Sequence, residues 1–118
     1  MRAVELEKIA DKWIEAHLKE ETTKFDEIFS DNNPDEYLDV IITILDKIDA
    51  NIDNKLFRLL AAGPLEDLLQ DNGTKVINRV VVLARQSPNF RKLLNGVWDY
   101  DFQESVKLEL VKYMQDKW

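Results

Sequence analysis

The chain contains no cysteine, and this absence removes several kinds of site at once. Disulfide bonds, thiolate metal ligands and a cysteine nucleophile are all excluded. Glycine and proline are also scarce, with three residues of each in 118. So few turn-forming residues argue against a turn-rich β fold. We therefore expect an all-α protein.

Long hydrophobic runs are missing as well. The longest, Val80–Ala84, is far shorter than the roughly 20 residues of a membrane-spanning helix. The N-terminal stretch carries Glu5, Glu7 and Asp11 where a secretory signal needs an apolar segment. We expect a cytoplasmic protein with no membrane contact, and a length that fits one compact domain over residues 1–118.

Basic residues are outnumbered, with 16 Lys and Arg against 23 Asp and Glu, for a net charge of −7. All of the excess lies in residues 1–59, which hold fifteen acidic and eight basic residues, whereas residues 60–118 hold eight of each. A phosphate backbone would be repelled by such a molecule. Nucleic acid is therefore not an expected partner.

Helix-start signals and apolar periodicity predict six or seven short to medium helices. Asn33-Pro34 and Ser87-Pro88 each combine an N-cap residue with a proline at the first helical position. Apolar residues at helical spacing predict a first helix ending near Leu18. From Tyr37 to Ile48 they cover roughly 200° of the helix circumference, which predicts the central, most buried helix.

The boundaries in the second half are expected at glycine and proline. Gly63 should end one helix, and Pro64 should begin a short one that Gly73 closes. The following helix contains three consecutive valines, Val80–Val82, which also permit a strand. Asp101 with Glu104 resembles a capping box for the last helix. Residues 20–33 are expected to form a loop with at most one helical turn.

A family resemblance rests on several blocks of the second half. Residues 59–69 read Leu-Leu-Ala-Ala-Gly-Pro-Leu-Glu-Asp-Leu-Leu, and Gly73, Ala84-Arg85 and a Phe-Arg pair follow, before the ending Gly96-Val97-Trp98. This series resembles a family of small, uncharacterised bacterial domains. The resemblance implies no activity. Trp13 and Trp98 match aromatic positions of that family and are expected in the core, whereas Trp118 is expected to be frayed.

Candidate chemistry is sparse. Glu66-Asp67 could act in acid–base catalysis, although acids near a helix N-terminus more simply offset its positive end. His17, the only histidine, lacks a partner for nucleophilic catalysis. The segment from Asp49 to Asn54 imitates a calcium loop but has Asn54 where glycine is needed and Leu60 where the bidentate glutamate belongs. We expect no catalytic residue, no metal and no cofactor.

The basic residues Arg85 and Arg91 fall within the family-like blocks. Carboxylates such as Glu66 or Asp67 are candidate partners for them, in which case they would lock neighbouring helices together. Intramolecular pairing or a solvated face is favoured over anion binding, given the acidic first half of the chain.

The acidic region is the main functional candidate. If residues 34–53 formed one helix, five carboxylates would lie within roughly 80° of each other around one exposed apolar residue. These predicted partner-binding residues are Asp35, Asp39, Ile42, Asp46, Asp49 and Asp53. A solvated helix face is the alternative interpretation.

The resulting hypothesis is a non-enzymatic, acidic module that binds a basic protein. Small acidic bacterial proteins of this kind often act as immunity proteins, which neutralise a nuclease-type toxin by covering its positive cleft. A helical scaffold or self-associating module is one alternative, and an enzyme with a carboxylate site is another.

Overall fold

The computed structural model describes residues 3–19 and 33–118, and every regular element within them is helical. The helices are α1 (Ala3–Leu18), α2 (Pro34–Lys47), α3 (Lys55–Leu60), α4 (Glu66–Gln86), α5 (Pro88–Leu94) and α6 (Glu104–Leu110). A π-helical turn (Ala61–Leu65) joins α3 to α4, and a 3₁₀ turn (Val111–Tyr113) follows α6. The expected all-α class is confirmed, and the valine run is helical. The loop expected before Asn33 lies outside the described residues.

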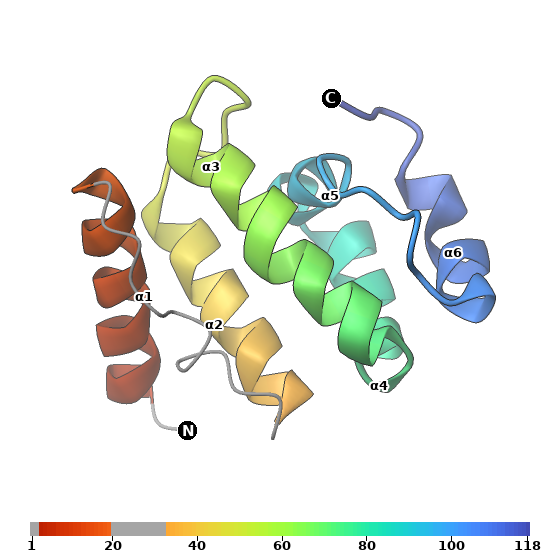
Figure 1. The fold of residues 1–118 in the computed structure, drawn as a ribbon, viewed down its shortest axis with the longest axis horizontal. Coiled ribbons are helices and arrows are strands. Elements are labelled where there is room, and N and C mark those ends of the chain that lie inside the picture. The colour runs from red at the N-terminus through yellow and green to blue at the C-terminus, as the bar shows by residue number, and fades with distance from the viewer. Residues whose placement is uncertain (1–2, 20–32) are drawn as a thin grey trace.

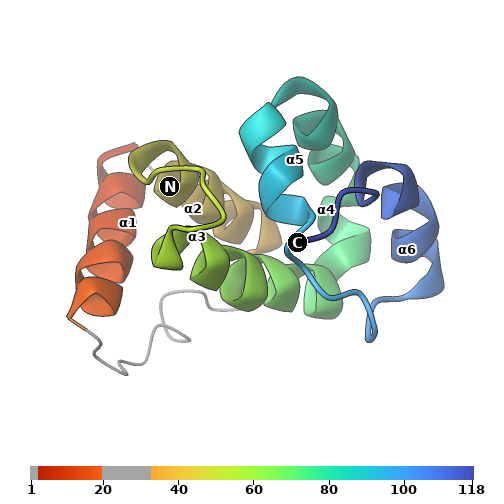
Figure 2. The same cartoon turned by 90° about the horizontal axis from the view of Figure 1, so that it is seen from above.

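The helices lie side by side, with α1 at one end of the molecule and α6 at the other (Figures 1 and 2). Helix α2 lies between α1 and the α3–α4 stretch and also contacts α5. Its side chains at Leu38, Ile41 and Ile44 are fully buried. The wide apolar face that the sequence predicted for this helix therefore packs against several neighbouring helices. None of the described helices is both long enough and apolar enough to cross a membrane.

Three helices begin at side-chain caps. The Asn33 side chain accepts a hydrogen bond from the Glu36 backbone N–H at 3.2 Å, and Ser87 accepts one from the Phe90 N–H at 3.1 Å. Asn54 caps α3 by accepting from the Leu56 N–H. Each cap satisfies a backbone donor that has no partner inside the helix. The starts at Asn33 and Ser87 were predicted, because capping depends on residues only three positions apart.

The capping box expected at Asp101 and Glu104 is wrong. Helix α6 begins at Glu104, and its N-cap residue, Gln103, makes no side-chain cap bond. The Asp101 carboxylate instead accepts a hydrogen bond from the Gln70 side-chain amide at 3.3 Å. A tertiary contact with α4 has therefore replaced the local one.

The helix end predicted at Gly63-Pro64 is also wrong. The chain stays helical through the π-helical turn, where the Glu66 N–H reaches back five residues to the Ala61 carbonyl. Proline normally disrupts a helix because it lacks an N–H and its ring collides with the preceding turn. The extra residue of a π turn relieves both problems. Pro64 is buried there. With the run from Lys55 to Gln86 counted as one stretch, the described residues contain five helices, fewer than the six or seven expected.

The helix end that was expected at Gly73 occurs as a kink at Asn72, whose φ of −137° and ψ of 25° are not helical. The chain folds back there, as Figure 1 shows. A straight helix of 32 residues would be about 48 Å long, which exceeds the longest dimension of the molecule, 36 Å. Gly73 is buried against α6, and a Cβ there would lie 2.9 Å from a methyl group of Val106.

Residues 113–118 are tied to α5 by Asn95, a buried polar residue. Its amide donates hydrogen bonds to the carbonyls of Arg91 and Tyr113 at 2.8 and 3.0 Å, and its side-chain oxygen accepts one from the Asp116 N–H. Trp118 follows and stacks on Phe57, with ring centroids 5.4 Å apart. The expectation from the sequence that Trp118 is frayed is therefore wrong.

Candidate protein-binding surface

The acidic stripe predicted on α2 is not one helical face. Helix α2 ends at Lys47, and Ile48 is extended, with φ of −115° and ψ of 161°. Asp49 and Asp53 therefore lie in the following loop. Asn51 and Asn54 organise that loop: Asn51 accepts from the Asp53 N–H, and Asn54 donates to the Asp49 carbonyl. Asparagine side chains that bond nearby backbone compete with helix in this way.

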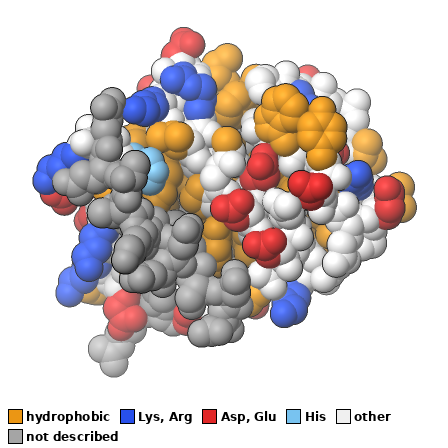
Figure 3. All heavy atoms as spheres, in the orientation of Figure 1, with side chains coloured by type: hydrophobic (Ala, Val, Ile, Leu, Met, Phe, Trp, Pro, Cys, Tyr) orange, Lys and Arg blue, Asp and Glu red, His pale blue; other side chains and the backbone are white. Residues whose placement is uncertain are grey.

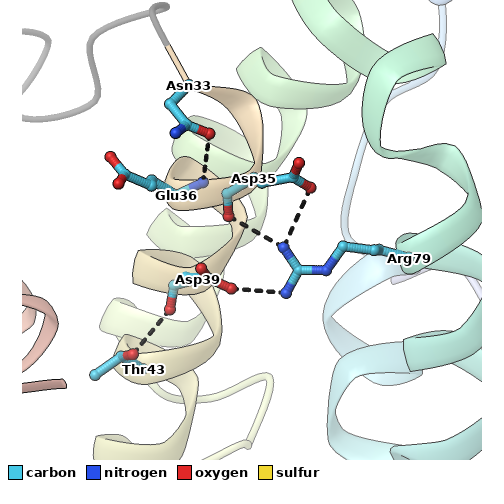
Figure 4. Close-up of polar contacts among 6 residues, drawn as sticks. All are labelled: Asn33, Asp35, Glu36, Asp39, Thr43 and Arg79. Carbon is cyan, nitrogen blue, oxygen red and sulfur yellow. Dashed lines mark hydrogen bonds and ion pairs between the residues drawn. The ribbon is translucent and has the colours of Figure 1, made fainter. Parts of the chain in front are cut away.

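Asp35 and Asp39 face α4 and share one arginine (Figure 4). The Arg79 guanidinium donates to Asp39 Oδ1 at 2.6 Å and to Asp35 at 3.1 Å (carbonyl) and 3.3 Å (carboxylate). Partial burial lowers the pKa of Arg79, but the hydrogen bonds and charges of Asp39 and Asp35 outweigh this effect and raise it above its ordinary value. Two of the six predicted residues thus take part in a contact between helices.

Ile42 is half-buried and packs against the core, whereas Asp46 is exposed near the end of α2. Ile42 therefore does not stand as an exposed apolar centre among the carboxylates. The structure brings Asp35 and Asp39 together, but it does not gather all six predicted residues into one surface. Their role in partner binding stays a prediction.

The other candidate groups are engaged in structural contacts. The Arg85 Nε donates to the Tyr113 hydroxyl at 2.8 Å, and Arg91 donates to the Ala84 carbonyl at 3.0 Å. The expected contacts of these two arginines with Glu66 are not formed. His17 forms a hydrogen bond with the Trp13 carbonyl. The two rings also lie in contact, with centroids 4.2 Å apart and planes tilted by 34°. Within residues 3–19 and 33–118, no three His, Asp or Glu side chains gather as a metal site would require.

Glu66 has a different role from the one expected, because no helix begins at Pro64. Its carboxylate accepts a hydrogen bond from the Trp98 backbone N–H at 2.8 Å. This bond ties the segment after α5 to α4, and the Gln70–Asp101 bond adds a second tie. Both ends of the segment are anchored in the core, by Val97 and Phe102. The four residues between them form an ordered loop, which we call the 98–101 loop.

The 98–101 loop presents two large aromatic side chains to solvent. Trp98 is 61% exposed and Tyr100 is 74% exposed, with ring centroids 5.5 Å apart and tilted by 46°. The expectation that Trp98 belongs to the core is therefore wrong. Val97 occupies the core position instead. The bond from the Trp98 N–H to Glu66 fixes the backbone so that the Trp98 side chain points outward.

Carboxylates surround this aromatic pair. Glu66, Asp99 and Asp101 lie on or against the loop through the contacts already described, and Asp67 and Asp71 are exposed on the same stretch of α4. In Figure 3, acidic side chains gather over α4 beside exposed hydrophobic side chains. We call this region, centred on Trp98 and Tyr100, the aromatic–acidic surface.

Residues 11–117 match the family of unknown function DUF6869. The chain belongs to this family. The match spans nearly the whole sequence, including all of the aromatic–acidic surface, and agrees with the resemblance inferred from the sequence blocks. Comparisons with curated proteins and with solved structures gave no match. The DUF6869 description assigns no activity, so function has to be argued from the surface itself.

Sequence analysis did not predict the aromatic–acidic surface of this DUF6869 chain. The one available signal was the spacing of Val97 and Phe102, two apolar residues that bracket Trp-Asp-Tyr-Asp. Tryptophan and tyrosine that alternate with acidic residues suit a wet, protein-contacting surface as well as a core. Their exposure follows from the tertiary bond to Glu66, which lies 32 residues away.

Proposed function

We propose that this protein is a binding module for a basic protein and that the aromatic–acidic surface is its contact site. The observation that carries the proposal is the exposure of Trp98 and Tyr100 on an ordered loop. Exposing two large rings to water is unfavourable in isolation, and contiguous exposed apolar surface often marks an interaction site. Tryptophan and tyrosine are also the residues most enriched at the energetic centres of protein interfaces.

The loop is held in place before any partner arrives. Glu66 and Gln70 of α4 bond to it, and Val97 and Phe102 anchor its ends. Less conformational entropy is therefore lost when a partner docks than with a flexible loop. The surrounding carboxylates favour a partner with a positive surface and would speed its approach at low salt. The net charge of −7 acts in the same direction over longer distances.

The specific role we propose is that of an immunity protein, which neutralises a basic, nuclease-type toxin by covering its active cleft. Its support is the small size, the acidity and an aromatic surface suited to insertion into a concave site. In this proposal, Asp46, Asp49 and Asp53 contribute to the attractive field, since all three are exposed. Asp35 and Asp39 contribute less, because Arg79 partly neutralises them.

The experiment is a binding titration with a purified basic toxin domain encoded beside the gene of this protein. We expect the double variant Trp98→Ala, Tyr100→Ala to bind more than tenfold more weakly, because interface aromatics of this kind contribute about 2 kcal/mol or more each. The variant should keep its melting temperature, since both side chains are exposed. Association of the unaltered protein should slow as salt is added.

The matched control is Leu18→Ala, which removes a side chain of similar exposure, 68%, on α1. Figure 2 shows α1 and α6 at opposite ends, and the 98–101 loop leads directly into α6. The control should bind normally. Normal binding by the double variant would place the contact elsewhere, and failure of every neighbouring toxin to bind would reject the immunity role.

A further inference from the structure

A cavity of about 280 Å³ opens beside the 98–101 loop. Three aromatic residues, Trp98, Tyr100 and Trp118, line it together with Asp99 and Lys117. Its size is just below that of small-molecule sites, which range from roughly 300 to 1,000 Å³. It is therefore suited to a single side chain rather than to a nucleotide or a large cofactor.

The Trp118 wall is rigidly held. Its ring stacks on Phe57 at an interplanar angle of 23°, and its indole N–H donates to the Lys92 carbonyl at 2.7 Å. Its backbone N–H donates to the Asn95 carbonyl at 3.3 Å. Gly96 makes this seat possible, because a Cβ there would lie 2.3 Å from the Trp118 ring. Three aromatic side chains from two separate segments are thus assembled around one cavity.

Asp99 supplies the acidic group of this cavity, and its present partner is weakly bound. The Lys117 ammonium lies 3.4 Å from the Asp99 carboxylate, and the two side chains are 49% and 36% exposed. Exposed ion pairs of this kind are worth about 0–1 kcal/mol. A cation that also gained aromatic contacts could therefore replace Lys117 at Asp99.

We propose that this cavity receives the guanidinium group of an arginine from the basic partner. This inference rests on the function proposed above, because the basic partner supplies the arginine. Aromatic faces attract cations, and the attraction grows when the site is shielded from water. Arginine suits the cavity better than lysine, because its planar guanidinium stacks on a ring while donating hydrogen bonds to a carboxylate. Lys117 occupies the carboxylate until the partner's arginine displaces it.

The test is a titration of the full chain, labelled with ¹⁵N, with N-acetyl-arginine methylamide. The protein has three tryptophans, each with one indole N–H resonance. We expect the resonances of Trp98 and Trp118 to shift together, while that of Trp13, which is 1% exposed in α1, stays in place. The citrulline analogue, which keeps the shape but lacks the charge, should bind at least tenfold more weakly, and the lysine analogue should lie between them.

Three variants separate a built site from a general attraction. Asp99→Asn should weaken arginine binding at least fivefold, whereas Lys117→Gln should strengthen it by removing the competitor. Tyr100→Ala, at an exposed position, should weaken binding without affecting the fold, and so keeps the test valid if Asp99→Asn is unstable. No shift of Trp98 and Trp118, equal binding of citrulline, or unchanged binding in both weakening variants would overturn the proposal.

The cavity and the proposed function fail separately. If the arginine probe binds as described and no basic toxin domain does, the cavity stands and the immunity role falls. If a toxin domain keeps its affinity after Asp99→Asn but loses it after Trp98→Ala with Tyr100→Ala, the aromatic–acidic surface stands and the arginine site is rejected.

Discussion

At the scale of single residues, Gly96 determines where Trp118 can lie. Its missing side chain leaves room for the indole ring that packs over it, and any Cβ would overlap that ring. Trp118 in turn covers Phe57 and closes one side of the cavity. The absence of a side chain at Gly96 therefore allows both the core packing of Trp118 and the candidate arginine site.

We predict that Gly96→Ala destabilises the protein by about 1–3 kcal/mol, because the added methyl group forces the Trp118 ring out of its seat. Urea unfolding would measure the loss, and the Trp118 indole resonance should move toward that of an exposed tryptophan. The matched control is Gly63→Ala, where a Cβ would meet nothing within 4 Å. Gly63 lies in a helical stretch, which favours alanine, but Pro64 follows directly and its ring disfavours a Cβ on the preceding helical residue, so the net change should be smaller than about 1 kcal/mol. Equal effects of the two substitutions would contradict this account.

The three tryptophans show where inference from the sequence succeeds and where it stops. Trp13 was predicted in the core, from its match to a family aromatic position, and it is buried there on the inner face of α1. Trp98 and Trp118 were assigned the reverse of their actual environments. Both follow non-helical turns, where side-chain direction depends on distant partners: Glu66 for Trp98, and the Lys92 carbonyl for Trp118. No periodicity encodes such contacts.

At the scale of elements, the contact between α2 and α4 is made in part by the Arg79 clasp, in which one guanidinium bridges Asp35 and Asp39. We predict that Arg79→Gln lowers the unfolding free energy by about 1 kcal/mol, a value kept modest because the side chains are partly exposed. The loss should shrink in about 0.5 M salt, where charge interactions are screened. Lys19→Gln, which breaks an exposed pair with Glu15 at the C-terminal end of α1, should cost less.

The raised pKa of Arg79 also fixes the pH dependence of the clasp. A group whose pKa is raised on folding contributes stability that is fully present below its unfolded pKa and is lost only as pH rises through the folded one. For arginine that loss lies above about pH 12. The difference between the unaltered protein and Arg79→Gln should therefore be the same at about pH 6 and about pH 9, as unfolding at both values would show.

Elements were predicted well where their signals were local. Asn33 and Ser87 marked helix starts correctly, since each cap involves its own neighbours. Pro64 misled, because the sequence does not reveal that a π-helical turn can absorb a proline. The acidic stripe failed for a related reason: the extended Ile48 ended α2 before Asp49 and Asp53 could join its face.

At the scale of the whole molecule, one apolar core extends from Ala10 in α1 to Met114 after α6. We predict that the chain unfolds as one cooperative unit. Two double variants, each with one remaining tryptophan, report on the two ends of this core. Trp98→Phe with Trp118→Phe leaves only Trp13, and Trp13→Phe with Trp98→Phe leaves only Trp118. In each, tryptophan fluorescence and far-ultraviolet circular dichroism should give coincident urea transitions. A Trp13 signal that changes at lower urea than the dichroism would show α1 to be a separate unit.

The π-helical turn Ala61–Leu65 also preserves the rotational phase of α4 relative to α3. In an α-helix each residue turns the chain by about 100°, so one extra residue would rotate every later side chain by that angle, whereas the wider π turn absorbs it. Deleting Gly63 would set Pro64 in an α-helical turn, where proline breaks the helix, and would displace Glu66 and Gln70 from the 98–101 loop that they hold. The turn thus acts as a register mark: it lets the same helix bury leucines before the bulge and aim its loop-binding side chains correctly after it.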